Sequence, residues 1–360
     1  MNERNNTKVY IAGIKTLLPQ LYDPELVASV VYPPEKASEL VNRLVKRAIK
    51  SIGIKNRTSV LSVEKYPEKV LLKDEYHPLN WGKAIVEHFL NYVNLEEIGH
   101  LSVSYNISSH LDFLPNLACQ IANEMNLNLE IPPEELPYLG CAAALFSLKS
   151  AIEYCSHSDK AAIIFNFDQC SWLCNPVMDQ RHPDFTSSLK SNLLFSDGAA
   201  GLLVIPESMK ERFHEHLIRI IDLETGYVKG SEIRMNNGRF LVGDNVRSIM
   251  PELVCNKILK PMLKKHDLAP SKISEWSVHQ GGKPILDTFT EPEILGLTHE
   301  QIQRSRELFE EYGNFSSPSC LFILESFFNE NKNGKDNNTI GAVVGFGAGF
   351  YLGAMLYNWI

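Results

Sequence analysis

The chain has 360 residues, a length that fits two domains of ordinary size or one large double unit. It carries 35 lysines and arginines against 43 aspartates and glutamates, and this formal net charge of −8 argues against a nucleic-acid-binding protein. Hydrophobic residues make up 44% and charged residues 22% of the chain, which are ordinary values for a globular protein and exclude extensive disorder.

The cysteine pattern argues against a metal site and against a disulfide framework. There are seven cysteines, an odd number, and no two of them form a CxxC pair. Unpaired thiols in this number are typical of a reducing compartment. The first residues are polar and show no secretory signal. We therefore expect a cytoplasmic protein without a bound metal.

Short apolar strands alternate with amphipathic helices along the first half of the chain. The pattern predicts strands at 8–14, 98–105, 161–167 and 201–205, and helices at 34–52, 115–125 and 141–152. Gly53 stands where the first helix needs a C-cap. The helix beginning at or beside Cys141 is the most informative of these elements, because small residues surround the thiol at its start.

The second half repeats this alternation. The pattern predicts helices at 243–265, 297–312 and 317–328, a strand ending at 276–279, and a polar loop at 329–338. Strands that alternate with helices indicate an α/β fold with mainly buried sheets. The two halves, 1–206 and 207–360, share this order of elements, although no repeat is visible by identity.

The last 21 residues, 340–360, carry no charge and are long enough to cross a bilayer. A Gly-x-Gly-x-Gly run at 345–349 fits a tight backbone bend better than a helix interior. No basic flank follows the segment. We therefore predict two buried strands joined by a glycine turn, and no membrane span.

Three side chains are candidates for chemistry. Cys141 lies at a predicted helix N-terminus, where unsatisfied N–H groups favour an anion, so we expect a thiol that ionises near neutral pH. His279 ends an apolar strand, and Asn314 lies between two helices. Each also has a plain structural interpretation, as a core cysteine, a hydrogen-bonding histidine and a residue of a capping turn.

Taken together, five ordered motifs resemble the chalcone and stilbene synthase-like family, the type III polyketide synthases among the thiolase-fold condensing enzymes. They are GCAA at 140–143, LFSDGAA at 194–200, WSVHQGGKPILD at 276–287, YGNFSS at 312–317 and GFGAG at 345–349. Three residues depart from the family pattern, namely Ser196, Gln280 and Ala348. The segment 235–239, with Val246 and Arg247, is more similar to ketoacyl-ACP synthase III.

The resemblance implies a five-layered αβαβα thiolase-like fold with two similar halves and a homodimer. It also implies a reaction in which Cys141 takes up the acyl group of a thioester as a nucleophile. A malonyl thioester then loses carbon dioxide, and His279 and Asn314 stabilise the enolate oxygen. The expected activity is an acyltransferase or ketosynthase that performs decarboxylative Claisen condensation toward a polyketide-type product.

Further positions follow from the same resemblance. Phe195 stands where the family has a gatekeeper between tunnel and cavity, although a core aromatic is an equal interpretation. Gly347 and Gly349 are expected to shape the cavity wall. The remaining set falls where relatives meet the phosphates of CoA, and comprises Arg43, Lys46, Arg47 and Lys50. A solvated helix face is the alternative interpretation of this set.

The resemblance implies CoA thioesters as substrates and no further cofactor. The expected partners are acyl-CoA with malonyl-CoA or a malonyl carrier protein, and no nucleic acid or membrane. The departures leave open the acyl starter, the number of extensions and the choice between CoA and carrier protein. Two alternatives remain: a non-decarboxylating acyltransferase or condensing enzyme on the same fold, and a non-catalytic partner subunit of a heterodimeric condensing enzyme.

Overall fold

A nine-stranded mixed sheet runs through the computed structural model, which describes residues 8–110, 112, 114–213, 217–236, 238–243, 245–331 and 339–360. Its order is β11-β12-β13-β8-β1-β7-β6-β4-β5. The strands of the first half are β1 (Val9–Leu17), β4 (Ile98–Tyr105), β5 (Glu134–Pro137), β6 (Ala161–Asp168) and β7 (Gly198–Pro206). Those of the second half are β8 (Ile218–Tyr227), β11 (Glu275–Val278), β12 (Ile340–Phe346) and β13 (Tyr351–Trp359).

The two halves of this sheet repeat one pairing scheme. In the first half β1 pairs antiparallel with β7, β7 antiparallel with β6, and β6 parallel with β4. In the second half β8 pairs antiparallel with β13, β13 antiparallel with β12, and β12 parallel with β11. Among the described strands, the two halves pair where Tyr10 and Ile11 of β1 face Arg219 and Ile218 of β8. The sheet is therefore two similar units joined at a short seam.

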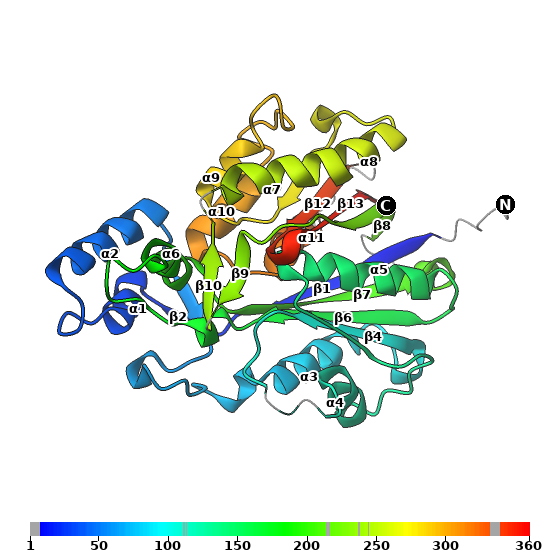
Figure 1. Ribbon diagram of the computed structural model, residues 1–360. Helices are drawn as coiled ribbons and strands as arrows, with labels where there is room; N and C mark the ends of the chain where they lie inside the picture. Colours follow the sequence, from blue (N-terminus) through cyan, green and yellow to red (C-terminus); the bar gives the residue numbers. More distant parts are fainter. Residues whose placement is uncertain are drawn as a thin grey trace.

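Helices cover both faces of each unit and complete five layers (Figure 1). One outer layer contains α3 (Pro78–Phe89) and α4 (Leu117–Glu124), and the other contains α7 (Val246–Val254), α8 (Lys260–Lys265) and α9 (Lys283–Thr288). The central layer holds α5 (Ala143–Cys155) and α11 (Ser319–Asn331). Each precedes the equivalent strand of its half, β6 or β12. The predicted αβαβα architecture is confirmed.

Alternating side chains along the strands explain this layering. On β6, Ile163 and Phe165 pack toward the outer helices, whereas Ala162 and Ile164 pack toward α5 and α11. All eight residues of β6 are buried, because a strand covered on both faces exposes neither set.

The predicted helices are found with shifted ends. The helix expected at 34–52 is α2 (Glu39–Ile52), which begins later because the Ser38 side chain caps it by accepting from Val41 N–H. It ends as predicted at Gly53, whose φ of +67° suits glycine. The helix expected at 297–312 contains α10 (Gln303–Tyr312), and the one at 243–265 is continued from α7 to α8 by a π-helical turn.

The uncharged C-terminal segment forms strands β12 and β13, as predicted. Gly345 pairs with Gly353 across the two strands, and Gly349 has a φ of +70° in the bend between them. Among the described residues, no helix is both long enough and apolar enough to span a bilayer. Most of the predicted polar loop, residues 332–338, lies outside the described residues, and 329–331 belong to α11.

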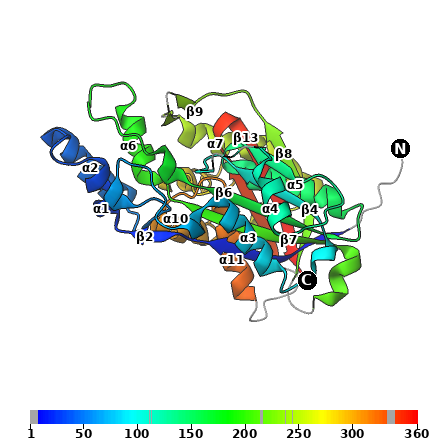
Figure 2. The same ribbon diagram turned by 90° about the horizontal axis from the view of Figure 1, so that it is seen from below.

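A lobe projects from one end of the layers (Figure 2). It contains α1 (Pro24–Val31), α2, α6 (Phe185–Leu194) and the short strands β2 (Gln20–Tyr22) and β3 (Arg57–Ser59). Apolar residues of α1, α2 and α6 form a separate small core. The hairpin of β9 (Ile233–Asn236) and β10 (Arg239–Val242) packs on α6. This lobe encloses the space beside Cys141.

Candidate active site

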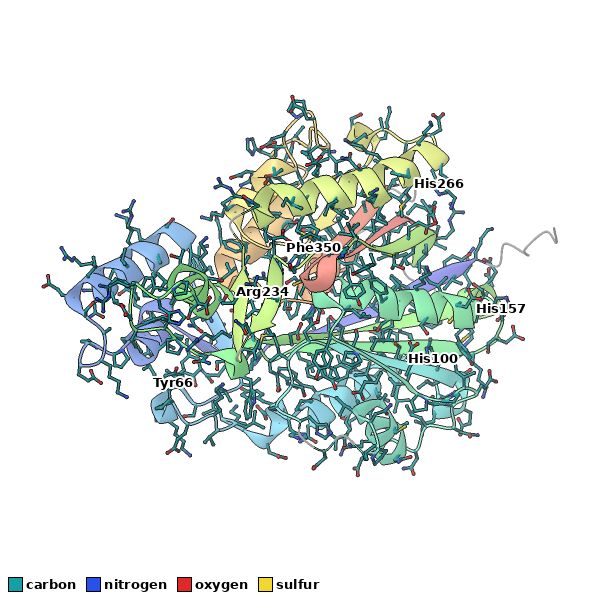
Figure 3. All side chains as sticks on the ribbon, viewed as in Figure 1. Tyr66, His100, His157, Arg234, His266 and Phe350 are labelled. Atoms are coloured by element: carbon teal, nitrogen blue, oxygen red, sulfur yellow. The ribbon has the colours of Figure 1, made fainter. Side chains whose placement is uncertain are left out.

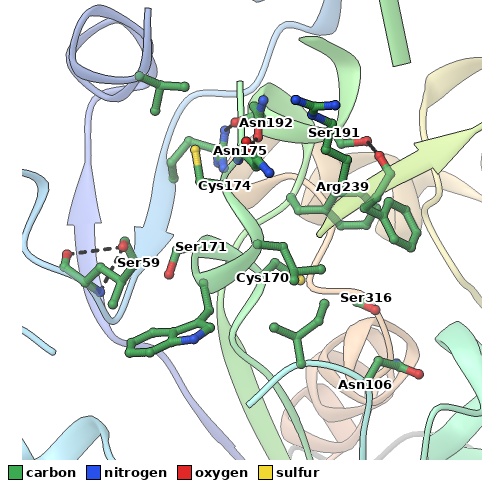
Figure 4. A pocket seen from close by; sticks show the side chains of 18 of the residues that line it. Ser59, Asn106, Cys170, Ser171, Cys174, Asn175, Ser191, Asn192, Arg239 and Ser316 are labelled. Atoms are coloured by element: carbon green, nitrogen blue, oxygen red, sulfur yellow. Dashed lines mark hydrogen bonds between the residues drawn. The ribbon is translucent and has the colours of Figure 1, made fainter. Parts of the chain in front are cut away.

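A cavity of about 400 Å³ lies between the lobe and the layered sheet. Its lining comes from α1, the segment 57–68, the loop 105–110, the turn at 138–141, the loop 170–175, α6, the β9–β10 hairpin, Ser316 and Ala348. Figure 4 shows Asn106 and Ser316 on one side of it and Asn175, Asn192 and Ser191 on another. Tyr66, which lines the cavity, lies at the lobe end of the molecule, opposite His157 and His266 (Figure 3).

Cys141 stands on a sharp turn at the start of the central helix α5. Tyr138 and Gly140 both have left-handed backbones, with φ of +66° and +60°, and a short 3-10 turn at Gly140–Ala142 follows. The Asn106 side chain donates to the Gly140 carbonyl at 3.1 Å, which holds the turn from the β4 side. Only 8% of Cys141 is exposed, yet it lines the cavity. The turn therefore presents the thiol to the cavity.

The strand-to-strand bend at 347–348 packs directly behind this thiol. A Cβ on Gly347 would lie 2.2 Å from the Cys141 backbone nitrogen, and one on Gly140 would lie 2.5 Å from that of Ala348. Only glycine permits such close approach of two backbones. Gly347 and Gly349 do not themselves line the cavity, contrary to prediction, and the wall residue between them is Ala348.

The electrostatics of Cys141 differ from the sequence-based expectation. Burial raises the pKa of the thiol to about 12, and the bond to the Ser316 hydroxyl, with Sγ and Oγ 3.5 Å apart, opposes this rise. The expected thiol that ionises near neutral pH is therefore not found. The cause is that desolvation disfavours the thiolate more than the Ser316 hydrogen bond favours it.

His279 directly follows β11 and is buried, with 3% of its surface exposed. Burial lowers the pKa of the imidazole to about 3, so the ring is neutral. Its Nδ1 atom is buried and has no hydrogen-bond partner among the described residues. A neutral ring with an unused nitrogen can donate or accept a hydrogen bond when a substrate oxygen enters.

Asn314 is held in one orientation by its neighbours. Its Oδ1 accepts from the Ser316 backbone N–H at 2.7 Å and from the Ser319 hydroxyl at 3.3 Å. Its backbone pairs with the segment around Phe195, through Asn314 N–H to Leu194 O and Ser196 N–H to Asn314 O. The side-chain oxygen is thus occupied, which leaves the amide NH₂ as the donor that a ligand can use.

A chain of contacts brings these three residues into one region. The His279 ring meets Phe346 edge-on at 5.4 Å, and Phe346 precedes Gly347, which touches Cys141. Asn314 binds the backbone of Ser316, whose hydroxyl meets the thiol. Cys141 and Ser316 line the cavity wall, whereas His279 and Asn314 lie buried behind it.

Phe195 lines the cavity and packs edge-on against Phe240 of β10, with ring centroids 5.1 Å apart. This aromatic pair stands between the Asn314 loop and the hairpin. The four basic residues of α2 do not line the cavity: Arg43, Lys46, Arg47 and Lys50 are exposed on the outside of the lobe. Arg43 approaches Glu39, with Nε and Oε1 4.0 Å apart.

Several residues at the site belong to no recognisable sequence motif. Asp168 ends β6 and accepts from Asn106 and Ile107 backbone N–H groups and from Ser317, which ties together the loops on both sides of Cys141. In the sequence, Asp168 is distinguished only as a polar residue that ends an apolar run. Arg57 and Arg239 reach the same cavity from segments far apart in the sequence.

No group of three or more histidine, cysteine or acidic side chains in the described part of the chain is arranged to hold a metal ion. The seven cysteines are free thiols. The Cys141 thiol and the two arginines line the cavity, and the His279 imidazole and the Asn314 carboxamide are buried near the thiol.

Known proteins are similar to this chain in sequence and in fold. Residues 239–360 match the C-terminal domain of chalcone and stilbene synthases. The chain is 25% identical to a presumed chalcone synthase of Bacillus subtilis (strain 168), over 90% of this chain and 94% of that protein. It is 26% identical to the 1,3,6,8-tetrahydroxynaphthalene synthase of Streptomyces coelicolor, over 88% of this chain and 83% of the relative.

The solved structures agree on the fold. PKS-I from the brown alga Ectocarpus siliculosus superposes over the whole of both chains with a TM-score of 0.80 at 19% identity. At this identity the likeness shows a shared thiolase-like architecture. The C-terminal domain match, the relatives aligned along most of the chain and this architecture together make the chain similar to chalcone and stilbene synthases and to type III polyketide synthases.

Proposed function

We propose that the protein condenses an acyl thioester with malonyl-CoA by decarboxylative Claisen chemistry, through an acyl group held on Cys141. The observation that carries this proposal is the thiol itself, presented by a left-handed turn at the end of a cavity of about 400 Å³. The buried imidazole and carboxamide beside it are the donors that the second half of the reaction needs.

In the first step the sulfur of Cys141 attacks the acyl-CoA carbonyl. The bond from carbon to the CoA sulfur breaks, and CoA leaves as a thiol with the proton that the cysteine gives up. Because burial disfavours the free thiolate, the proton must leave as the thioester arrives. We assign this proton to the neutral His279 ring, whose Nδ1 has no hydrogen-bond partner among the described residues.

In the second step malonyl-CoA loses carbon dioxide, and the electron pair of the broken C–C bond forms an enolate on the thioester. His279 and the Asn314 amide donate hydrogen bonds to the enolate oxygen. The enolate carbon then attacks the acyl carbonyl, and the electron pair of the breaking carbon–Sγ bond passes to the sulfur, which takes up a proton as the 3-oxoacyl-CoA leaves. One oxyanion donor contributes about 10²–10³ in rate in comparable sites, so two neutral donors suffice as the main catalytic machinery.

Acyl-CoA and malonyl-CoA are the proposed substrates, with no cofactor besides them. We also propose a location in the cytoplasm, supported by the seven free thiols, and a homodimer, which the family resemblance implies. The exposed basic residues of α2 lie on the outer surface of the lobe, where they would bind the phosphates of CoA. A charge-reversal pair, Lys46→Glu with Lys50→Glu, should raise the KM for acyl-CoA without changing the mass of the adduct on Cys141.

The proposal is tested by intact-protein mass spectrometry. Wild-type protein incubated with a panel of acyl-CoAs should gain the mass of one acyl group, and Cys141→Ala should gain none. Cys119→Ala, a change at a partly exposed cysteine outside the cavity, is the matched control and should load normally.

Release of carbon dioxide from malonyl-CoA then separates the alternatives. A condensing enzyme of the proposed kind releases one equivalent for each extension, and a non-decarboxylating acyltransferase releases none. Acyl loading of the Cys141→Ala variant would overturn the proposal. Loading that appears only after a second chain is added would assign the protein to a heterodimer.

A further inference from the structure

Two arginine side chains reach the cavity in addition to the residues that the reaction uses. Arg57 is the first residue of β3, and Arg239 is the first residue of β10. Both lie against α6: Arg57 Nη1 donates to the Asn192 carbonyl at 3.1 Å, and Phe240, next to Arg239, accepts from Ser191 at 2.8 Å. The arginines therefore approach neighbouring residues of one helix from two sides.

Arg57 is a buried cation with little compensation. Only 7% of the residue is exposed, and its Nε atom has no hydrogen-bond partner. No ion pair joins it to a carboxylate within the described residues. Asp197 is the acidic residue in its field, but that carboxylate accepts from Val60 N–H and from Ser171 instead. A buried charge of this kind is costly unless a partner binds it.

Arg239 also lacks a hydrogen-bond partner for part of its guanidinium group. Its Nε is buried without a partner, and the approach to Asp184 is a loose one, with Nη1 and Oδ2 4.0 Å apart. Figure 4 shows its side chain extending toward the wall that carries Ser191, Asn192 and Asn175, away from Ser316 beside the thiol. Glu68, which carries the carboxylate on the cavity lining, is exposed to solvent.

We propose that Arg57 and Arg239 form a carboxylate-binding site in the cavity, and that the acyl starter carries a carboxylate at the end remote from its thioester. This assignment rests on the proposed function, because it names the substrate class of the same cavity. Guanidinium groups bind carboxylates by paired, charge-assisted hydrogen bonds, and both arginines line this cavity. A dicarboxylic acyl group would satisfy both ends at once, with the thioester at Cys141 and the free carboxylate at the arginines.

The test measures binding, so that it does not depend on catalysis. In the Cys141→Ala background, calorimetry gives the Kd of glutaryl-, adipoyl- and suberoyl-CoA against pentanoyl-, hexanoyl- and octanoyl-CoA, pairs that differ in one carboxylate. At the best-fitting length the dicarboxylic ligand should bind at least about tenfold tighter, since a charged hydrogen bond is commonly worth this much.

Arg239→Gln in the same background should bring that ratio to about one, whereas Arg57→Lys, which keeps the charge, should reduce it only in part. Arg234→Gln is the matched control, because Arg234 lies on the same hairpin outside this cavity and donates to Ser231 O. It should leave the ratio unchanged. Unaltered affinity for the monocarboxylic ligand shows that each variant is folded.

The outcomes separate the possible sources of the carboxylate. A ratio near one without the Arg239 change, or a ratio that this change does not alter, overturns the proposal. If Arg239→Gln weakens malonyl-CoA relative to propionyl-CoA and leaves the longer pairs unaffected, the site binds the extender, and the starter assignment is overturned. Failure of wild-type protein to acylate Cys141, with the binding preference intact, would refute the proposed reaction alone.

Discussion

Ser316→Ala tests how the structure controls the reactivity of Cys141. The Ser316 hydroxyl is the hydrogen-bond partner that the described residues give to the thiol, and this bond lowers a pKa that burial raises to about 12. A hydrogen bond of this kind is worth about 1 kcal/mol. Its loss should raise the pKa by about 0.7. At any pH below the pKa the thiolate fraction then falls about fivefold.

The assay is the rate of alkylation of Cys141 by iodoacetamide, followed by peptide mass spectrometry from about pH 6 to about pH 10, because only the thiolate reacts. This whole range lies below the pKa, so the variant should react about fivefold more slowly than the wild type at every pH. Easier entry of the reagent would change the rate in the opposite direction, by raising it.

Ser191→Ala is the matched control, because its hydroxyl also lines the cavity but donates to the Phe240 carbonyl at 2.8 Å. Its profile should match that of the wild type. An unchanged or faster alkylation rate in Ser316→Ala would refute the reasoning. It would mean that another group, such as a protonated His279, stabilises the anion.

Three further predictions concern the surroundings of the thiol. Gly347→Ala places a methyl group 2.2 Å from the Cys141 backbone nitrogen, so we expect a loss of about 1–3 kcal/mol in urea unfolding and much slower acyl loading; wild-type values for both would contradict the packing described. The neutral, buried His279, with its pKa lowered to about 3, stabilises the fold above the unfolded-state value near 6.5, and this contribution is lost as the pH falls. Between pH 7 and pH 5 the wild type should therefore lose about 2 kcal/mol more than His279→Gln, and parallel curves would show that the ring is protonated or solvated. Phe240→Ala removes the edge-on partner of Phe195 and should speed loading of bulky acyl-CoAs relative to acetyl-CoA; an unchanged ratio across the acyl panel would exclude a gating role for this pair.

Local patterns predicted most of the elements because their causes are local. The apolar run at 161–167 and the alternation around α2 follow from burial on both faces or on one face of an element. Helix starts were less accurate, since the Ser38 cap decides where α2 begins and several polar residues before it were equally suitable. The uncharged C-terminus was interpreted correctly as strands because its glycines disfavour a helix.

The reactivity of the thiol could not be predicted from position in a helix. The N-terminal location of Cys141 favours an anion, but burial opposes it, and burial depends on packing by Gly347 and Ser316 from more than 170 residues away. The role of the cavity arginines could not be predicted from the sequence for the same reason. Arg57 and Arg239 stand in polar, unremarkable sequence, and only the tertiary arrangement buries them.

The sequence alone determined the positions of many strands and helices and the buried character of the sheets, and its motifs indicated the cysteine, histidine and asparagine of the proposed chemistry. The sequence did not predict α3, α6 or β8, the strand through which the two halves pair. The similarity of the two halves, the depth of the cavity and the protonation states inside it were decided by the tertiary structure. Secondary structure and motifs depend on neighbours along the chain, whereas desolvation and the pairing of charges depend on which distant segments pack together.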